Sequence, residues 1–108
     1  FATLVQDDIA VKVVILNNGF LGMVRQWQEL FFEKRYSMTH IESPDFIGVA
    51  KAYRIDGQKV TKRSELQSGI QKMLQHKGPY VFEVEVEQEE NVFPMIPSGA
   101  TVEEVRLE

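Results

Sequence analysis

The feature that most constrains the fold is the segment Val11–Lys34, because the spacing of its apolar residues changes once along its length. Residues 11–16 form a nearly continuous apolar run. A strand that is buried on both faces of a sheet reads in this way, whereas a helix repeats its apolar residues every three or four positions. After Asn17–Gly19, the helical spacing begins, with Phe20, Val24, Trp27 and Phe31. The segment therefore predicts a strand, a polar turn and a helix.

The polar turn has two interpretations. Asn-Gly between apolar runs is also typical of a β-hairpin, because both residues tolerate a positive φ. The helical spacing that follows Gly19 favours the strand–turn–helix arrangement instead. Open α/β sheets bind ligands at the carboxyl ends of their strands, and the amides of Asn17 and Asn18 offer oxygens that a hard cation accepts. The residues alone leave a plain turn and a ligand site both open.

The rest of the chain predicts two further strands and two further helices. Ser43-Pro44-Asp45 predicts a helix start, with Ser43 as the cap and the helix ending near Arg54. Ile55–Val60 predicts a strand, and Ser64 with Gln67 forms a candidate capping box for the next helix. Residues 80–87 predict the last strand. This order predicts an α/β fold with a parallel sheet, flanking helices and right-handed crossovers.

Three glutamates alternate with apolar residues in the last strand, at positions 83, 85 and 87. They could form a carboxylate site, but the solvated face of a half-exposed strand is the favoured interpretation. Arg25 is likewise interpreted as a solvated helix charge. Neither His40 nor His76, the only histidines, is assigned a catalytic role.

Composition narrows the class of protein. The chain has 108 residues, a net charge of −4 and no cysteine, so disulfides and thiolate chemistry are excluded. Its basic residues are scattered, which argues against nucleic-acid binding, and no apolar run is long enough to cross a membrane. These properties are compatible with the cytoplasm. We expect one domain, with an α/β core over residues 1–90 and an arm over residues 91–108 that ends in a short helix capped by Thr101 and Glu104.

The segment after the asparagines resembles one family closely. The sequence LNN followed by GMVRQWQELFFEKRYS is similar to acetohydroxyacid synthase (acetolactate synthase), the large catalytic subunit. The resemblance extends through PDFIGVAKAY, GPYVFEVEV and ENVFPMIPSGATVEEV. Arg54 departs from the family, which usually has glycine there. The double asparagine is shared by many thiamine-diphosphate enzymes, whereas GMVRQWQ is much more specific. The resemblance implies a three-layer, flavodoxin-like thiamine-diphosphate-binding domain, present here in part.

In that family the asparagine pair closes the cofactor motif. The resemblance implies that Asn18 supplies a side-chain oxygen to Mg²⁺ and that Phe20 supplies a backbone carbonyl, while Asn17 holds the turn. Cofactor-binding residues carried over by the resemblance are Asn18, Gly19, Phe20, Leu21, Gly22 and Met23. Gly19 permits close approach of the backbone to the diphosphate, and the start of the following helix directs N–H groups to the same anion.

Met23 and Trp27 lie four residues apart on one helical face. For a helix of unknown family, packing in a core is the favoured interpretation. The resemblance reverses this for Trp27, because the matching tryptophan of the family lines the pocket of the second 2-oxo acid. Met23 and Trp27 are therefore the predicted substrate-pocket residues.

The resemblance implies a transferase that condenses pyruvate with pyruvate or 2-oxobutyrate, releases CO₂, and serves the synthesis of branched-chain amino acids. The implied partners are the rest of the same polypeptide, further copies in a homo-oligomer and a small regulatory subunit. FAD belongs to the family, with a site mostly outside this chain. We expect a fragment that is inactive alone and contains no catalytic residue. The alternatives are another thiamine-diphosphate carboligase or decarboxylase, and a non-catalytic α/β interaction module.

Overall fold

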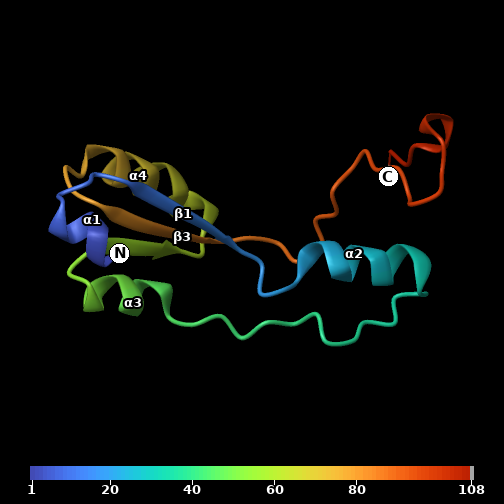
Figure 1. Cartoon of the computed structure of the whole chain (residues 1–108), viewed down its shortest axis with the longest axis horizontal. Coiled ribbons are helices and arrows are strands. Elements are labelled where there is room, and N and C mark those ends of the chain that lie inside the picture. The colour runs from blue at the N-terminus through green and yellow to red at the C-terminus, as the bar shows by residue number, and fades with distance from the viewer. Residues whose placement is uncertain (108) are drawn as a thin grey trace. The chain divides into compact units, whose positions relative to one another are not determined.

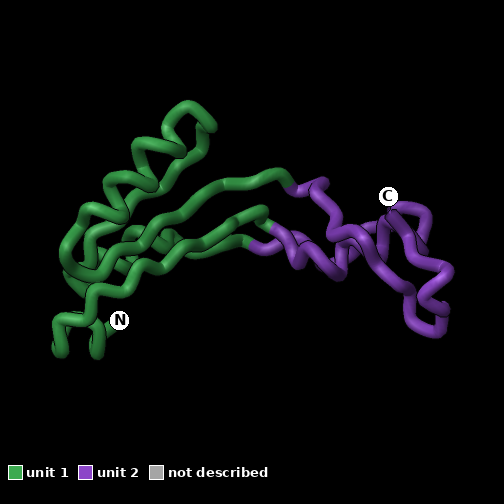
Figure 2. The backbone as a smooth tube through the Cα atoms, turned by 90° about the horizontal axis from the view of Figure 1, so that it is seen from above, with its two compact units in different colours: residues 1–19, 42–87 green, residues 20–41, 88–108 purple. Residues whose placement is uncertain are grey.

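The computed structural model describes residues 1–107 and divides into two compact units, which we describe separately (Figure 2). Unit 1 comprises residues Phe1–Gly19 and Glu42–Glu87. Unit 2 comprises residues Phe20–Ile41 and the chain from Gln88 onward. The division expected from the sequence, a core over residues 1–90 and an arm over residues 91–108, stays a prediction.

Unit 1 is built on a parallel sheet of three strands in the order β1-β3-β2. The strands are β1 (Lys12–Asn17), β2 (Asp56–Val60) and β3 (Tyr80–Glu85). β3 is central, and its first residue, Tyr80, is paired in register with Lys12 on one side and with Asp56 on the other. The three predicted strands are confirmed, and their ends differ from the predicted ones by at most two residues. The hairpin interpretation is wrong, because β1 leads into a helix and both strand pairings are parallel.

Helices cover both faces of this sheet. Figure 1 shows α3 (Phe46–Ala52) and α4 (Arg63–Gln75) on opposite sides of the strands. On the α4 side the buried apolar cluster consists of Val60, Met73, Tyr80 and Phe82. On the α3 side it consists of Ala50, Ile55 and Val81. The expected three-layer arrangement is thereby confirmed. The short helix α1 (Ala2–Gln6) precedes the sheet, and the ring of Phe1 packs edge-on against Tyr53.

Two predicted helix starts are wrong. The cap of α3 is Asp45, whose carboxylate accepts the Gly48 N–H at 2.8 Å, so Ser43 lies outside the helix. Helix α4 begins at Arg63, one residue before Ser64, and its first residue has no side-chain cap before it. The end of α3 is close to the predicted position near Arg54, since the helix ends at Ala52 and Arg54 has φ of +60°, the left-handed conformation that commonly follows a helix.

Unit 2 consists of α2 (Gly22–Phe31), the connection that follows it, and a C-terminal segment, which we define as residues 88–107. The connection runs back beside the start of α2, where the Leu21 N–H donates to the Thr39 carbonyl at 2.8 Å. The C-terminal segment contains the short 3₁₀ helix η1 (Val102–Glu104), whose predicted capping box between Thr101 and Glu104 is confirmed. Over residues 1–107, none of the helices has the length and apolar character needed to span a membrane.

Candidate cofactor and substrate site

The carboxyl end of β1 is held by the side chain of Asn17. Its Oδ1 accepts hydrogen bonds from the Gly19 N–H at 3.0 Å and from the Ser43 hydroxyl at 3.2 Å. Its Nδ2 donates to Glu83 Oε1 at 2.8 Å. A side-chain amide that bonds the N–H two residues later fixes the turn locally. Asn17 therefore stabilises the turn, in agreement with its expected structural role.

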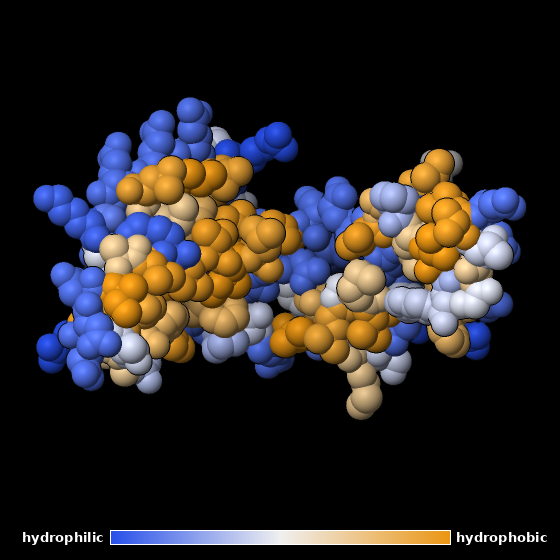
Figure 3. All heavy atoms as spheres, turned by 45° about the horizontal axis from the view of Figure 1, so that its top comes forward, coloured by the Kyte–Doolittle hydropathy of each residue, from blue (hydrophilic) through white to orange (hydrophobic). Residues whose placement is uncertain are grey.

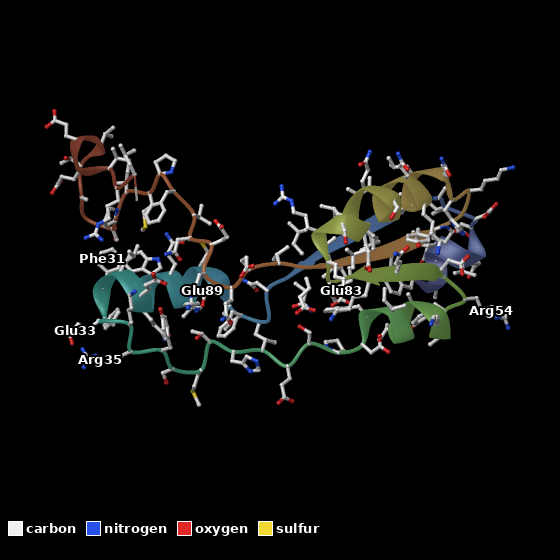
Figure 4. The ribbon with its side chains drawn as sticks, turned by 180° about the vertical axis from the view of Figure 1, so that it is seen from behind. Phe31, Glu33, Arg35, Arg54, Glu83 and Glu89 are labelled. Atoms are coloured by element: carbon white, nitrogen blue, oxygen red, sulfur yellow. The ribbon has the colours of Figure 1, made fainter. Side chains whose placement is uncertain are left out.

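Glu83 corrects the expectation that the glutamates of β3 face solvent. Its residue is only 3% exposed, because β3 is the central strand and both neighbouring strands flank it. Its carboxylate lies near the carboxyl ends of β1 and β2 (Glu83 is labelled in Figure 4). There it accepts a hydrogen bond from Asn17 and lies 3.4 Å from Lys59 Nζ. A buried carboxylate requires such partners. Sequence alternation gave no signal of this burial.

Lys59 joins two carboxylates at this end of the sheet. Its Nζ lies 3.3 Å from Glu85 Oε2 as well as 3.4 Å from Glu83 Oε1. The hydrogen bond with Glu85 is the main cause of the raised pKa of Lys59, and the bond with Glu83 adds to it. One ammonium group thus lies between two carboxylates, and Glu83 links this cluster to Asn17, the last residue of β1.

Gly19 has φ of +69°, and no atom lies within 4 Å of the place where a Cβ would be, its chain neighbours apart. The left-handed conformation explains the glycine, and the open space beside it leaves room for a ligand. Asn18, which precedes it, is half-buried and carries a neutral amide oxygen. These features fit a phosphate-bound hard cation, whose preferred ligands are oxygens.

In unit 2, helix α2 begins at Gly22, and its N-cap residue is Leu21, whose side chain cannot accept a hydrogen bond. The N–H groups of the first turn therefore have no side-chain cap, which suits an anion. Met23 is 53% exposed and Trp27 is 36% exposed, with the Trp27 ring 4.7 Å from the ring of Phe31. Neither side chain is buried in a core of this chain, so both offer surface to a ligand or to another part of a longer protein.

The buried residues of α2 are instead Arg25 and Gln26, at 7% and 1% exposure. The solvated interpretation of Arg25 is wrong. Its guanidinium lies 3.3 Å from Glu29 and 3.4 Å from Glu89, a residue of the C-terminal segment that Figure 4 labels. It also donates to the Gln88 carbonyl at 3.1 Å and lies 4.5 Å from the centre of the Tyr36 ring. The sequence contained no signal that Gln88 and Glu89 help to bury Arg25, because these two partners lie more than sixty residues away.

The histidines lie in structural contacts. His76 Nε2 is 3.0 Å from Asp56 Oδ2, at the end of the sheet where β2 and β3 begin, and the His40 ring packs edge-on against Phe20. Among residues 1–107, no group of three or more histidine, cysteine, aspartate or glutamate side chains is arranged to hold a metal ion. The amide and carbonyl oxygens that follow β1 remain as ligands of the kind that a hard cation prefers.

Residues 1–84 match the family model "Thiamine pyrophosphate enzyme, C-terminal TPP binding domain", thiamine pyrophosphate being thiamine diphosphate. Residues outside this match include the C-terminal segment. The fold is similar to that of a thiamine diphosphate-dependent 4-hydroxybenzoylformate decarboxylase from Rhodococcus jostii RHA1, with a TM-score of 0.72 and 23% identity over 83% of this chain and 17% of that one.

Curated relatives are more similar in sequence. The chain is 41% identical over 95% of its length to the acetolactate synthase isozyme 2 large subunit of Escherichia coli K12. It is 47% identical over 98% to the mitochondrial acetolactate synthase of Schizosaccharomyces pombe, and 45% over 93% to the mitochondrial catalytic subunit of Saccharomyces cerevisiae. It spans only 19%, 16% and 15% of these relatives. The matched residues and the fold show that the chain belongs to the thiamine pyrophosphate enzyme family, as its C-terminal TPP-binding domain.

Proposed function

We propose that the chain is the cofactor-binding domain of an acetolactate synthase large subunit. The observation that carries this proposal is the sequence identity of 41–47% to three acetolactate synthases over at least 93% of the chain. The parent enzyme would join two molecules of pyruvate, or pyruvate and 2-oxobutyrate, with release of CO₂. Bound thiamine diphosphate supplies the decarboxylation and carbon–carbon bond chemistry, and the protein positions the reactants.

Within the cofactor site, Asn18 and Phe20 would provide oxygens to Mg²⁺ through a side chain and a backbone carbonyl. Gly19 would let the diphosphate approach the backbone, and residues 21–23 would face it with the uncapped N–H groups of α2. Support comes from the positive φ and open surroundings of Gly19, and from the Leu21 cap that bonds no side chain. Asn17 would act by holding the turn, through its bonds to Gly19 and Glu83.

Met23 and Trp27 would form part of the pocket for the second 2-oxo acid. A rigid aromatic wall distinguishes substrates that differ by one methylene by about 1–3 kcal/mol. The exposure of both side chains supports this role, since a residue packed in a core offers no surface to a substrate.

The test is Trp27→Leu in the full-length enzyme, with pyruvate and 2-oxobutyrate in competition. We expect the ratio of acetolactate to acetohydroxybutyrate to change by about tenfold, while the affinity for thiamine diphosphate stays within about twofold. Phe32→Leu is the matched control, because Phe32 is an exposed aromatic residue just beyond the end of α2. An unchanged ratio would remove Trp27 from the pocket, and the absence of any acetolactate from the unmodified enzyme would refute the proposed reaction.

The remaining features of the parent enzyme are proposed from the resemblance. They are a homo-oligomer, a possible small regulatory subunit, FAD held mostly by other residues, and a cytoplasmic location, although several relatives are named as mitochondrial or chloroplastic. The 108-residue chain by itself should form no acetolactate and bind thiamine diphosphate with Mg²⁺ only weakly, because contacts exposed to water contribute little. Calorimetric titration tests this, and a dissociation constant in the low micromolar range would contradict it.

A further inference from the structure

Gln26 is the least exposed of the buried polar residues, at 1%, and its partners lie in the C-terminal segment. Its Nε2 donates to the Val92 carbonyl at 3.0 Å, and its Oε1 accepts the Val92 N–H at 2.9 Å. The same Nε2 lies 3.2 Å from Met95 Sδ. The side-chain amide thus pairs with the backbone of Val92 as a neighbouring strand would. Removing the amide would take away both of these partners of the Val92 backbone and weaken the hold of α2 on the C-terminal segment.

From this clamp, a series of contacts leads back to the aromatic face of α2. Met95 and Arg106 pair through two backbone hydrogen bonds of 3.0 and 2.8 Å. The Arg106 guanidinium lies 4.9 Å from the centre of the Phe31 ring, which lies 4.7 Å from the Trp27 ring. The contact network therefore begins at Gln26 and ends at the residue next to it, after passing through the C-terminal segment.

We infer that Gln26 is a positioning residue for substrate choice, which it serves by fastening the C-terminal segment to α2 and thereby setting the orientation of the Trp27 ring. The inference rests on the proposed role of Trp27 beside the second 2-oxo acid. Gln26 itself is buried and touches no substrate in this account. Its effect passes through the Met95–Arg106 pair and the Phe31 ring.

The chain provides a matched control in Gln28. Its Nε2 donates to the Ser37 carbonyl at 2.9 Å, and its Oε1 accepts the Ser37 N–H at 3.0 Å. This is the same reciprocal pairing from the same helix, but it is exposed and binds the connection after α2. Replacing either glutamine with methionine removes both hydrogen bonds at nearly constant side-chain volume. The two variants therefore differ in which segment they release.

The experiment compares Gln26→Met and Gln28→Met in the full-length enzyme labelled with 5-fluorotryptophan. The Trp27 resonance is assigned by its absence from Trp27→Phe. For Gln26→Met we expect a shifted Trp27 resonance, faster proteolysis within residues 88–107, and a product ratio changed by about threefold or more, with kcat for pyruvate alone within about twofold. Gln28→Met should change none of these three. Arg106→Met interrupts the same path at an exposed residue, by removing the guanidinium that lies over the Phe31 ring, so it should shift the Trp27 resonance and the product ratio in the same way and serves if Gln26→Met fails to fold.

Two outcomes would overturn the inference. One is faster proteolysis in Gln26→Met with an unshifted Trp27 resonance and an unchanged product ratio, which would make the clamp purely structural. The other is an equal effect of Gln28→Met, which would show that releasing either segment from α2 changes the Trp27 ring and the product ratio. If Trp27→Leu leaves the ratio unchanged, the proposed pocket fails, whereas the fluorine resonance still decides whether Gln26 positions the ring.

Discussion

The two compact units bury opposite kinds of side chain. Among the described residues, every buried apolar side chain belongs to unit 1, in the clusters above and below the sheet. In unit 2 the buried side chains are Arg25, Gln26 and Thr39, all of them polar. The apolar residues of α2 are partly exposed, and apolar surface is visible on both units (Figure 3).

This difference has an energetic meaning. Apolar burial contributes about 25 cal/mol for each Å² and needs no particular partner, so the core of unit 1 can stabilise the sheet by itself. A hydrogen bond contributes only about 0.5–1.5 kcal/mol net but requires one geometry. The hydrogen bonds of unit 2 therefore fix the geometry of its segments but contribute little to its free energy of unfolding. Its exposed Met23 and Trp27 would gain their burial from a substrate or from the rest of a longer protein.

The largest expected effect comes from comparing Phe82→Ala in unit 1 with Phe31→Ala in unit 2. Phe82 is 1% exposed and touches the site of Gly69, where an added Cβ would lie 2.8 Å from its ring. We expect Phe82→Ala to lower the free energy of unfolding by about 3–5 kcal/mol, and the half-buried Phe31 to cost about 1 kcal/mol. Urea denaturation followed by circular dichroism measures both. Equal losses would show that unit 2 depends on apolar burial as much as unit 1 does.

A smaller effect is expected at the buried carboxylate of unit 1. Glu83→Leu removes the acceptor of Asn17 Nδ2 and one partner of Lys59, so the free energy of unfolding should fall by about 1–3 kcal/mol. Glu83→Gln keeps an oxygen for Asn17 and should lose less. The same denaturation measures both variants. If leucine is tolerated as well as glutamine, the bond to Asn17 contributes nothing, and the turn before Asn18 is held by other contacts.

The sequence predicted elements that depend on local spacing. The three strands, α2 and the Thr101–Glu104 box all follow from residues within a few positions of one another. The family followed from the GMVRQWQ segment, and its TPP-binding domain is confirmed. The roles of Asn18 and Phe20 at the metal stay predictions.

Burial of polar residues could not be predicted, because it depends on pairing between distant segments. Glu83 is buried because β3 lies between β1 and β2, an order that no local pattern fixes. Arg25 and Gln26 are buried because Gln88, Glu89 and Val92 return to α2. In an amphipathic helix the apolar stripe normally faces inward. Here the C-terminal segment covers the polar side chains of α2 instead.

The smallest expected effect concerns a single hydroxyl group in the apolar core of unit 1. Tyr80 is 1% exposed, and its hydroxyl is the one buried side-chain polar atom of the described residues that has no hydrogen-bond partner. Burial raises the pKa of Tyr80, with the charge of Asp56 adding to it. The stability linked to its protonated form is therefore present below the unfolded pKa near 10 and is lost as the pH rises through the folded value.

Tyr80→Phe should consequently leave the stability at pH 7 unchanged or raise it by up to about 1 kcal/mol, and it should reduce the loss of stability above pH 10. The same substitution in unit 2 should have the opposite sign. Tyr36 donates its hydroxyl to Glu29 at 3.2 Å, so Tyr36→Phe removes a satisfied bond and should cause a small loss. Thermal unfolding at pH 7 and pH 10.5 measures both variants. Because the substitution is identical, stability changes of opposite sign would show that the effect of losing a hydroxyl depends on whether it has a hydrogen-bond partner. A loss of stability at both sites would mean that the Tyr80 hydroxyl has a partner after all.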